Sequence, residues 1–262
     1  MNKKTKIPFV AGNWKMHMTI PEARELASKI VKSSVGLSEA EIVVAPPFTA
    51  LSEVMKVLED SSVQLSGQDL YWEEKGAFTG EISASMLKNA GCQYVIIGHS
   101  ERRQYFGETD SGVNKKIKAA LQHDLFPIVC IGESLEEREK GETMGKVARQ
   151  IEKGLDGLGS NDFERVIIAY EPVWAIGTGK TATPAQAEEV QAFIREKLAS
   201  RYGKDPASCA IIIYGGSVKP ENSYDLLSEK NIDGFLVGGA SLEAESFIRI
   251  IEQAIKAFKE KK

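Results

Sequence analysis

The chain contains few of the residues that build disulfide frameworks and metal centres. Its 262 residues include three cysteines and three histidines. The cysteines, Cys92, Cys130 and Cys209, are odd in number, far apart and set in apolar surroundings, so we expect buried thiols rather than a disulfide framework. No two histidines have the spacing that places metal ligands on one face of a helix. We therefore predict no structural or catalytic metal.

The chain also lacks a long apolar run and an excess of positive charge. No apolar stretch is long enough to cross a bilayer, and the run from Ile7 to Gly12 is too short for the core of a secretory signal. Thirty-three basic residues stand against thirty-seven acidic ones, a formal net charge of −4. This balance argues against nucleic acid or an anionic membrane as partner and leaves room for a local site for a small anion. We expect a cytoplasmic protein with a small substrate.

Eight short apolar runs recur along the chain, and most are continuously apolar rather than alternating. Such runs are typical of parallel strands that are covered on both faces, and parallel strands need crossover segments between them. The third run is weak evidence by itself. The predicted strands are Ile7 to Ala11, Glu41 to Ala45, Val63 to Leu65, Tyr94 to Ile97, Phe126 to Ile131, Val166 to Ala169, Ala210 to Tyr214 and Phe235 to Val237.

The segments between these runs carry helix signals, most clearly from 183 to 202. Thr183 and Gln186 have the spacing of a capping box, and Gly203 can end the helix. The last predicted helix has an apolar face over 247–258, followed by a lysine-rich tail that we expect in solvent.

Eight strand and helix units without a linker or a change of composition favour a closed (β/α)8 barrel, an α/β fold of eight parallel strands surrounded by helices. We expect a single domain that covers residues 1–262. An open, flavodoxin-like sheet with additions is the alternative if the eighth run is not a strand. In a (β/α)8 barrel the active site lies at the carboxyl ends of the strands, so the polar residues that follow the apolar runs are the candidates for chemistry.

Glu171 follows the sixth run and is the candidate general base. Pro172 stiffens the backbone beyond it, and Gly177 lies in a glycine-bearing loop that can close over a ligand. Closure beside Trp174 would remove water from the carboxylate and raise its proton affinity, as proton abstraction requires. The alternative is a strand-end glutamate held in a structural ion pair.

Two cofactor motifs are incomplete in the same loop. Gly179, Lys180 and Thr181 look like the end of a nucleotide-triphosphate loop, but Trp174 stands where the first glycine of that motif belongs. The dinucleotide spacing from Gly177 to Ala182 lies several residues past the strand end, outside the tight turn that such a motif needs. We therefore expect no cofactor.

Three further polar residues follow predicted strands. His99 precedes a short predicted helix whose start disfavours positive charge, and a neutral imidazole there can donate a hydrogen bond to a substrate carbonyl. Lys15 brings positive charge to an anionic substrate, and Asn13 can hold Lys15 or a substrate oxygen by hydrogen bonds. A satisfied core histidine and a solvated lysine are the alternatives. Glu101 either orients Lys15 or pairs with a neighbouring arginine, and we assign it no direct chemistry.

Two glycine-rich turns, 215–217 and 238–241, follow the seventh and eighth runs. Their small residues let backbone N–H groups approach a phosphate at the place where (β/α)8 barrels often bind one. A single turn of this kind usually means only a tight connection. Two of them on adjacent strands favour a phosphate site.

Six segments together resemble the triosephosphate isomerase family, and the resemblance covers nearly the whole chain. They are FVAGNWKM at 9–16, IGHSERR at 97–103, CIGE at 130–133, YEPVWAIGTGKTA at 170–182, YGGSV at 214–218 and VGGAS at 237–241. The resemblance implies the TIM barrel fold and a cofactor-free interconversion of dihydroxyacetone phosphate and D-glyceraldehyde 3-phosphate. It implies Glu171 as the base and neutral His99 as the electrophile, with Lys15 and Asn13 binding the substrate and stabilising an enediolate.

The resemblance also implies the phosphate ligands. Gly177 in the closed loop would bind the substrate phosphate together with Ser217, Gly238 and Gly239, through backbone hydrogen bonds. Closure of the loop would protect the enediolate from losing phosphate.

A second subunit is suggested by the segment 66–81, which is long for a connection in a barrel. Its aromatic side chains, Tyr71, Trp72 and Phe78, are costly to leave in water. In the family the corresponding loop, here with Gln68, Thr79 and Gly80, inserts into a second subunit beside its Lys15 and His99. We therefore expect a homodimer formed through this loop, and the alternative is a loop that is mobile or packs locally on its own chain.

Two other classes of protein stay open as alternatives. One is another phosphate-binding barrel, an epimerase with metal ligands or an aldolase with a Schiff-base lysine, although neither pattern appears in the chain. The other is a barrel that only binds or assembles. The presence of Asn13, Lys15, His99 and Glu171 together argues against a non-catalytic barrel.

Overall fold

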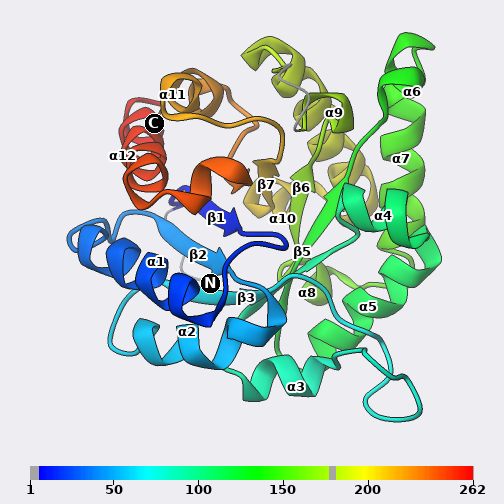
Figure 1. Ribbon diagram of the computed structural model, residues 1–262. Helices are drawn as coiled ribbons and strands as arrows, with labels where there is room; N and C mark the ends of the chain where they lie inside the picture. The colour runs from blue at the N-terminus through cyan, green and yellow to red at the C-terminus, as the bar shows by residue number, and fades with distance from the viewer. Residues whose placement is uncertain (1–5, 177–180, 262) are drawn as a thin grey trace.

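The computed structural model describes residues 6–176 and 181–261. In this part of the chain, eight parallel strands close into a barrel in sequence order, and β1 pairs with both β2 and β8. Figure 1 shows the strands at the centre and the helices around them. The strands are β1 (Phe9–Asn13), β2 (Glu41–Ala45), β3 (Gln64–Gly67), β4 (Tyr94–Ile97), β5 (Phe126–Ile131), β6 (Ile167–Tyr170), β7 (Ile211–Tyr214) and β8 (Gly234–Val237). The predicted closed (β/α)8 barrel is confirmed, because β8 is a strand that completes the ring.

Helices connect the strands and cover the outside of the barrel, as parallel pairing requires. They are α1 (Ile20–Ser33), α2 (Leu51–Leu58), α3 (Ala84–Asn89), α4 (Ser100–Phe106), α5 (Asp110–Gln122), α6 (Leu135–Glu139), α7 (Thr143–Gly154), α8 (Ser160–Phe163), α9 (Pro184–Tyr202), α10 (Lys204–Cys209), α11 (Pro220–Ser228) and α12 (Ala244–Glu260), with short 3-10 turns η1 (Phe48–Ala50), η2 (Val173–Ala175) and η3 (Gly239–Leu242). Among the described residues, these helices include none that is long and apolar enough to cross a membrane.

The barrel has two apolar layers, which arise from the alternation of side chains along each strand. One layer fills the inside of the barrel, with Phe9, Ala11 and Leu236 among its members. The other layer, which includes Val10, lies between the strands and the helices. β8 approaches β1 so closely at Gly234 that a Cβ there would lie 1.9 Å from the carbonyl oxygen of Phe9. Only glycine fits at that point of closure.

Three predicted strands, β2, β4 and β5, have the expected bounds, whereas β1 and β3 extend into less apolar sequence. β1 ends at Asn13, so this residue belongs to the strand rather than following it, and its backbone pairs with Ala45. β3 continues to Gly67, which pairs with Val95 of β4. Backbone pairing with a neighbouring strand does not require an apolar side chain, and an apolar run therefore underestimates the strand.

The predicted helix at 183–202 is confirmed as α9. Thr183 caps it by accepting a hydrogen bond from the N–H of Gln186, and Gly203 follows its end with φ of +93°. Two expectations are wrong. Cys209 is exposed at the end of α10, whereas Cys92 and Cys130 are buried as predicted. Lys261 does not lie free in solvent, because its Nζ donates to the carbonyl oxygen of Ile232 at 2.8 Å.

Candidate active site

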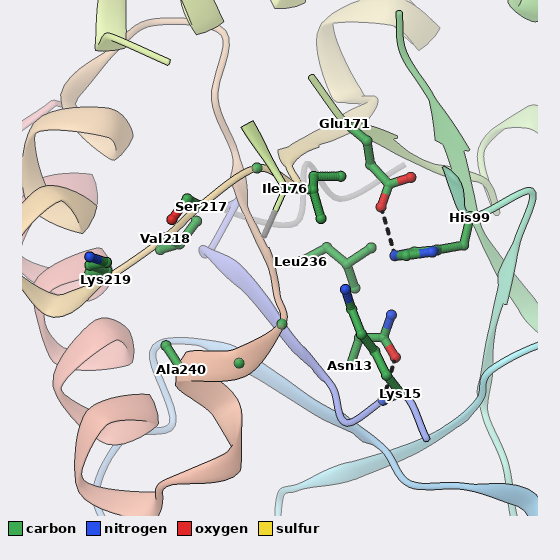
Figure 2. A pocket seen from close by; sticks show the side chains of 14 residues that line it. Asn13, Lys15, His99, Glu171, Ile176, Ser217, Val218, Lys219, Leu236 and Ala240 are labelled. Atoms are coloured by element: carbon green, nitrogen blue, oxygen red, sulfur yellow. Dashed lines mark hydrogen bonds and ion pairs between the residues drawn. The ribbon is translucent and has the colours of Figure 1, made fainter. Parts of the chain in front are cut away.

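A cavity of about 290 Å³ lies at the carboxyl ends of the strands. Figure 2 shows Glu171, His99, Lys15 and Asn13 on one side of it and Ser217 to Lys219 with Ala240 on the other. The residues that line the cavity are Asn13, Lys15, His99, Glu171, Ile176, Gly215, Gly216, Ser217, Val218, Lys219, Leu236, Gly238, Gly239 and Ala240. Every predicted site residue within the described part of the chain lines this cavity, whereas Gly177 lies outside the described residues.

Glu171 is the residue directly after β6, and its side chain is 2% exposed. Its backbone N–H donates to the carbonyl oxygen of Ile131 at 2.8 Å, which ties it to the end of β5. One carboxylate oxygen, Oε2, accepts a hydrogen bond from the backbone N–H of Ser100 at 2.9 Å. The other, Oε1, lies 3.0 Å from Nε2 of His99, the contact drawn as a dashed line in Figure 2. A buried carboxylate is thus held by groups from the start of α4.

Opposing effects set the charge of Glu171. Burial raises the pKa of its carboxyl group, because a charge is poorly solvated inside the protein. His99, the N–H of Ser100 and the ammonium group of Lys15 lower the pKa by more, so the net direction is downward. Glu171 is therefore a carboxylate, the form that a general base needs.

His99 is the N-cap residue of α4. Its Nδ1 accepts a hydrogen bond from the backbone N–H of Glu101 at 3.2 Å, so the proton of a neutral ring lies on Nε2, the nitrogen that faces Glu171. Nε2 also faces the cavity, where a substrate oxygen would accept that proton's hydrogen bond.

The expected depression of the His99 pKa does not hold in the ligand-free protein. Burial lowers the pKa, but the carboxylates of Glu171 and Glu101 raise it by more, and the net direction is upward. The start of α4 does not decide the pKa of His99, because a carboxylate 3.0 Å away has a larger effect on the pKa of an imidazole than one turn of helix.

Lys15 is held by contacts on both its backbone and its side chain. Its backbone has φ of +51°, a left-handed conformation that costs roughly 1–2 kcal/mol in a residue other than glycine. The N–H of Lys15 donates to Oδ1 of Asn13 at 3.0 Å, so Asn13 supports this turn. The ammonium group lies 2.5 Å from Oε1 of Glu101, which settles Glu101 as the partner that orients Lys15. Lys15 is thus ion-paired, with a side chain that is 25% exposed.

Gln68 lies at the turn that carries Lys15. Its Nε2 donates to the carbonyl oxygens of Lys15 and Ala45 of its own chain, both at 2.8 Å. The amide of Gln68 therefore holds the turn that carries Lys15 within its own chain, and the insertion of the 66–81 loop into a second subunit stays a prediction. The exposed part of the segment begins later, at residues 73–81.

The two glycine turns form the wall of the cavity opposite the titratable groups. Gly238 lies next to Lys15, since a Cβ at this position would be 3.5 Å from Cε of the lysine. Gly239 has nothing within 4 Å of such a Cβ, which leaves its backbone open to the cavity. Ser217 begins the turn after Gly216 and receives a hydrogen bond on its carbonyl oxygen from Asn222. This wall presents backbone groups, and the ammonium group of Lys15 lies at its edge beside Gly238, which together suit a phosphate.

Some lining residues were not predicted from the sequence. Ile176 and Leu236 give the cavity an apolar side, and Lys219 adds a second cation at its edge. The inward position of Leu236 could have been predicted from the alternation of side chains along β8. No sequence pattern around Lys219 indicates that it lies at the cavity. Among the described residues there is no cluster of three or more histidine, cysteine, aspartate or glutamate residues arranged to hold a metal ion.

Comparison with known proteins places the chain among close relatives. A family model described as Triosephosphate isomerase matches residues 8–254. A triosephosphate isomerase from Moorella thermoacetica is 56% identical over 244 residues, which cover 93% of this chain and 97% of the relative. One from Thermoanaerobacter pseudethanolicus is 56% identical over 244 residues, covering 93% of this chain and 98% of the relative. One from Trichlorobacter lovleyi is 52% identical over 246 residues, covering 94% and 98%.

Proposed function

Because the chain belongs to the triosephosphate isomerase family, we propose that it interconverts dihydroxyacetone phosphate and D-glyceraldehyde 3-phosphate through an enediolate. The observation that carries the proposal is the placement of Glu171 and His99 in one cavity whose opposite wall is two glycine turns. A carbon acid next to a carbonyl needs a base for its proton and a donor for the developing oxygen charge. The cavity supplies both beside a place for the phosphate.

In the proposed mechanism Glu171 removes a proton from the carbon next to the substrate carbonyl. The electron pair of the broken C–H bond forms the C=C bond of the enediolate, and the carbonyl π pair moves onto oxygen. His99 donates a hydrogen bond from Nε2 to that oxygen, and the ammonium group of Lys15 stabilises its negative charge. The hydroxyl proton on the neighbouring carbon's oxygen then passes by way of Nε2 of His99 to the first oxygen, and its O–H electron pair forms the new C=O bond. The C=C pair takes back the proton from Glu171 at the carbon that carried the original carbonyl.

Substrate binding must change the contacts of Glu171. Its carboxylate faces Nε2 of His99 and the N–H of Ser100, so Glu171 and His99 occupy each other's polar groups. A substrate that enters between the two side chains replaces the carboxylate as the acceptor for His99. Loss of this partner and exclusion of water both raise the pKa of Glu171 toward that of a stronger base.

The phosphate would lie against the backbone N–H groups of Ser217, Gly238 and Gly239, with Lys15 beside it. Gly177 would add a further N–H when the loop closes, and it lies outside the described residues. Trp174, at the amino-terminal side of this loop, donates from Nε1 to Oε1 of Glu133 at 2.9 Å. This bond gives the loop a fixed starting point.

The active form of the protein is proposed to be a homodimer. Large apolar side chains are exposed on the segments after β1, β2, β3 and β4, which are neighbours in the barrel. Met16 is 95% exposed, Tyr105 68% and Phe106 69%, and residues 73–81 are exposed as well. Large exposed apolar side chains on the connections of four neighbouring strands are what a surface covered by a partner would present. A second copy would cover them.

The test is an isomerisation assay that couples each triose phosphate to a dehydrogenase, run in both directions on chelator-treated protein. Glu171→Gln should lower kcat by roughly 10²- to 10⁴-fold, the range for loss of a general base. Glu164→Gln, an exposed residue just before β6, is the matched control and should retain activity. Activity lost on chelation would support a metal-dependent barrel instead, and no turnover by folded native protein would support a non-catalytic one.

A further inference from the structure

Arg103 lies on α4, beyond the cavity wall, and its guanidinium turns back toward the start of the helix. Nε donates to the carbonyl oxygen of Gly98 at 2.8 Å, and one terminal nitrogen donates to Oδ1 of Asp110 at 2.6 Å. The other terminal nitrogen donates to the carbonyl oxygen of Cys130 at 3.4 Å. One planar group therefore joins the end of β4, the end of β5 and the start of α5.

The guanidinium group of Arg103 hydrogen-bonds to the first carbonyl oxygens beyond the point where the backbone pairing of β4 and β5 stops. The last pair between β4 and β5 is Ile97 with Val129. The next residue of each strand, Gly98 and Cys130, is the one whose carbonyl oxygen accepts from Arg103. Gly98 has φ of +73°, so the chain turns away from the sheet at this residue and leaves its carbonyl without a strand partner. The fork geometry of arginine suits two acceptors at fixed positions.

Both predicted catalytic side chains depend on the two segments that Arg103 joins. On the α4 side, the N–H of Ser100 holds Oε2 of Glu171, and the N–H of Glu101 holds Nδ1 of His99. On the β5 side, the carbonyl oxygen of Ile131 holds the backbone of Glu171. A shift between α4 and β5 would therefore change the distance between His99 and Glu171.

We propose that Arg103 is a positioning residue for the isomerisation, which fixes the start of α4 against β5 and thereby sets the spacing of His99 and Glu171. The inference rests on the proposed function of the cavity. The role is geometric rather than electrostatic toward substrate, because Arg103 does not line the cavity and Asp110 neutralises its charge. A lysine at this position would keep the positive charge but would lose the planar guanidinium group that reaches several acceptors at once.

Arg103→Lys is the test variant, and Arg24→Lys, on the exposed surface of α1, is the matched control. We expect Arg103→Lys to lower kcat by about 10- to 100-fold, the order that a displacement of about 1 Å costs. KM should change by less than about threefold, because the glycine turns that would bind phosphate are untouched. Asp110→Asn, which keeps an acceptor oxygen but loosens the pair, should act in the same direction with a smaller effect.

A second readout does not depend on turnover. The chain has three histidines, so the ring nitrogens of ¹⁵N-labelled protein can be resolved one by one. The Nδ1 and Nε2 signals of His99 should shift in Arg103→Lys, and those of His17 and His123 should not. A shifted His99 signal in a protein whose native form does not isomerise triose phosphates would refute the proposed function and leave the positioning role intact.

The inference is overturned if Arg103→Lys keeps kcat within twofold of the native value with an unchanged His99 spectrum. It is also overturned if kcat falls only in proportion to the fraction of unfolded protein, measured by thermal unfolding, because the role would then be structural. If Arg103→Lys does not fold, Asp110→Asn decides by the same two criteria.

Discussion

Nε2 of His99 lies 3.0 Å from Oε1 of Glu171 at the carboxyl ends of two strands that are not direct neighbours in the barrel. β4 precedes His99 and β6 precedes Glu171, so the contact spans the strand between them. Each side chain is a polar partner of the other, and the proposed substrate would enter between them. The first two predictions follow from this contact.

Replacing His99 should impair catalysis and move its pH dependence. His99→Asn removes the proposed donor to the enediolate oxygen, and we expect kcat/KM to fall by roughly 10²- to 10³-fold. The variant also loses the imidazole that lowers the pKa of Glu171, while the burial that raises this pKa remains. The acidic limb of the kcat/KM profile should therefore move to higher pH. His123→Asn, at the end of α5, should leave both the rate and the limb unchanged.

The stability that the pair contributes should be greatest in mildly acidic solution. Glu171 has a folded-state pKa below its ordinary value of 4.5, so its contribution is present above 4.5 and is lost as pH falls through the lower folded value. His99 has a folded-state pKa above its ordinary value of 6.5, so its contribution is complete below 6.5 and is lost as pH rises through the higher folded value. Both contributions to stability are therefore present between pH 4.5 and pH 6.5.

Thermal unfolding of native protein and Glu171→Gln tests this expectation. The difference in Tm should be larger at about pH 5.5 than in alkaline solution, because the contribution of His99 is lost as the pH rises through its raised folded-state pKa. Glu164→Gln provides the baseline for loss of an exposed carboxylate. A difference that grows steadily toward alkaline pH would contradict the assigned directions.

Lys15→Met should weaken both substrate binding and turnover. The variant removes the cation that faces the phosphate wall and the proposed enediolate, and it leaves the carboxylate of Glu101 without its partner. We expect kcat/KM to fall by roughly 10²- to 10³-fold, comparable to the loss of one donor from an oxyanion site. Steady-state kinetics measure the effect, with Lys32→Met on the exposed surface of α1 as control. Native-like kcat/KM would exclude Lys15 from the site.

A charge on the exposed apolar surface should prevent dimer formation. Phe106→Glu places a carboxylate in the surface that we propose to be covered by a second copy. Burying an unpaired charge there would cost roughly several kcal/mol of association free energy. Sedimentation should find monomers, with reduced activity. Val35→Glu alters a residue that is 83% exposed outside this surface and should sediment as the native protein does. If native protein is itself monomeric, the dimer proposal is wrong.

Gly215 should be needed for the placement of the base. A Cβ at this position would lie 2.9 Å from Cγ of Glu171, closer than ordinary contact, so Gly215→Ala must displace the carboxylate or the turn. We expect kcat to fall by about 10- to 100-fold. Gly145→Ala, on α7, has nothing within 4 Å of its new Cβ and should leave kcat unchanged while stabilising the helix slightly. Equal activities of the two variants would show that the base tolerates the shift.

Much of the fold was predictable because strands buried on both faces must be continuously apolar. β2, β4 and β5 appear with the predicted bounds, and the resemblance to the triosephosphate isomerase family is confirmed by the family model over residues 8–254. The candidates for chemistry were also predictable, since Glu171 and His99 follow apolar runs and a barrel gathers such residues at one end. The sequence alone therefore determined the fold class and the candidates for the chemistry.

Tertiary structure decided how those residues are held. The contact between Lys15 and Glu101, the use of Gln68 to support the turn of Lys15, and the upward direction of the His99 pKa each depend on groups far apart in the chain. The direction in which a side chain leaves its backbone, and the register between strands, decide such contacts at the scale of an ångström. Electrostatic and hydrogen-bond energies change steeply over that distance, whereas the apolar periodicity of a sequence carries no information about it.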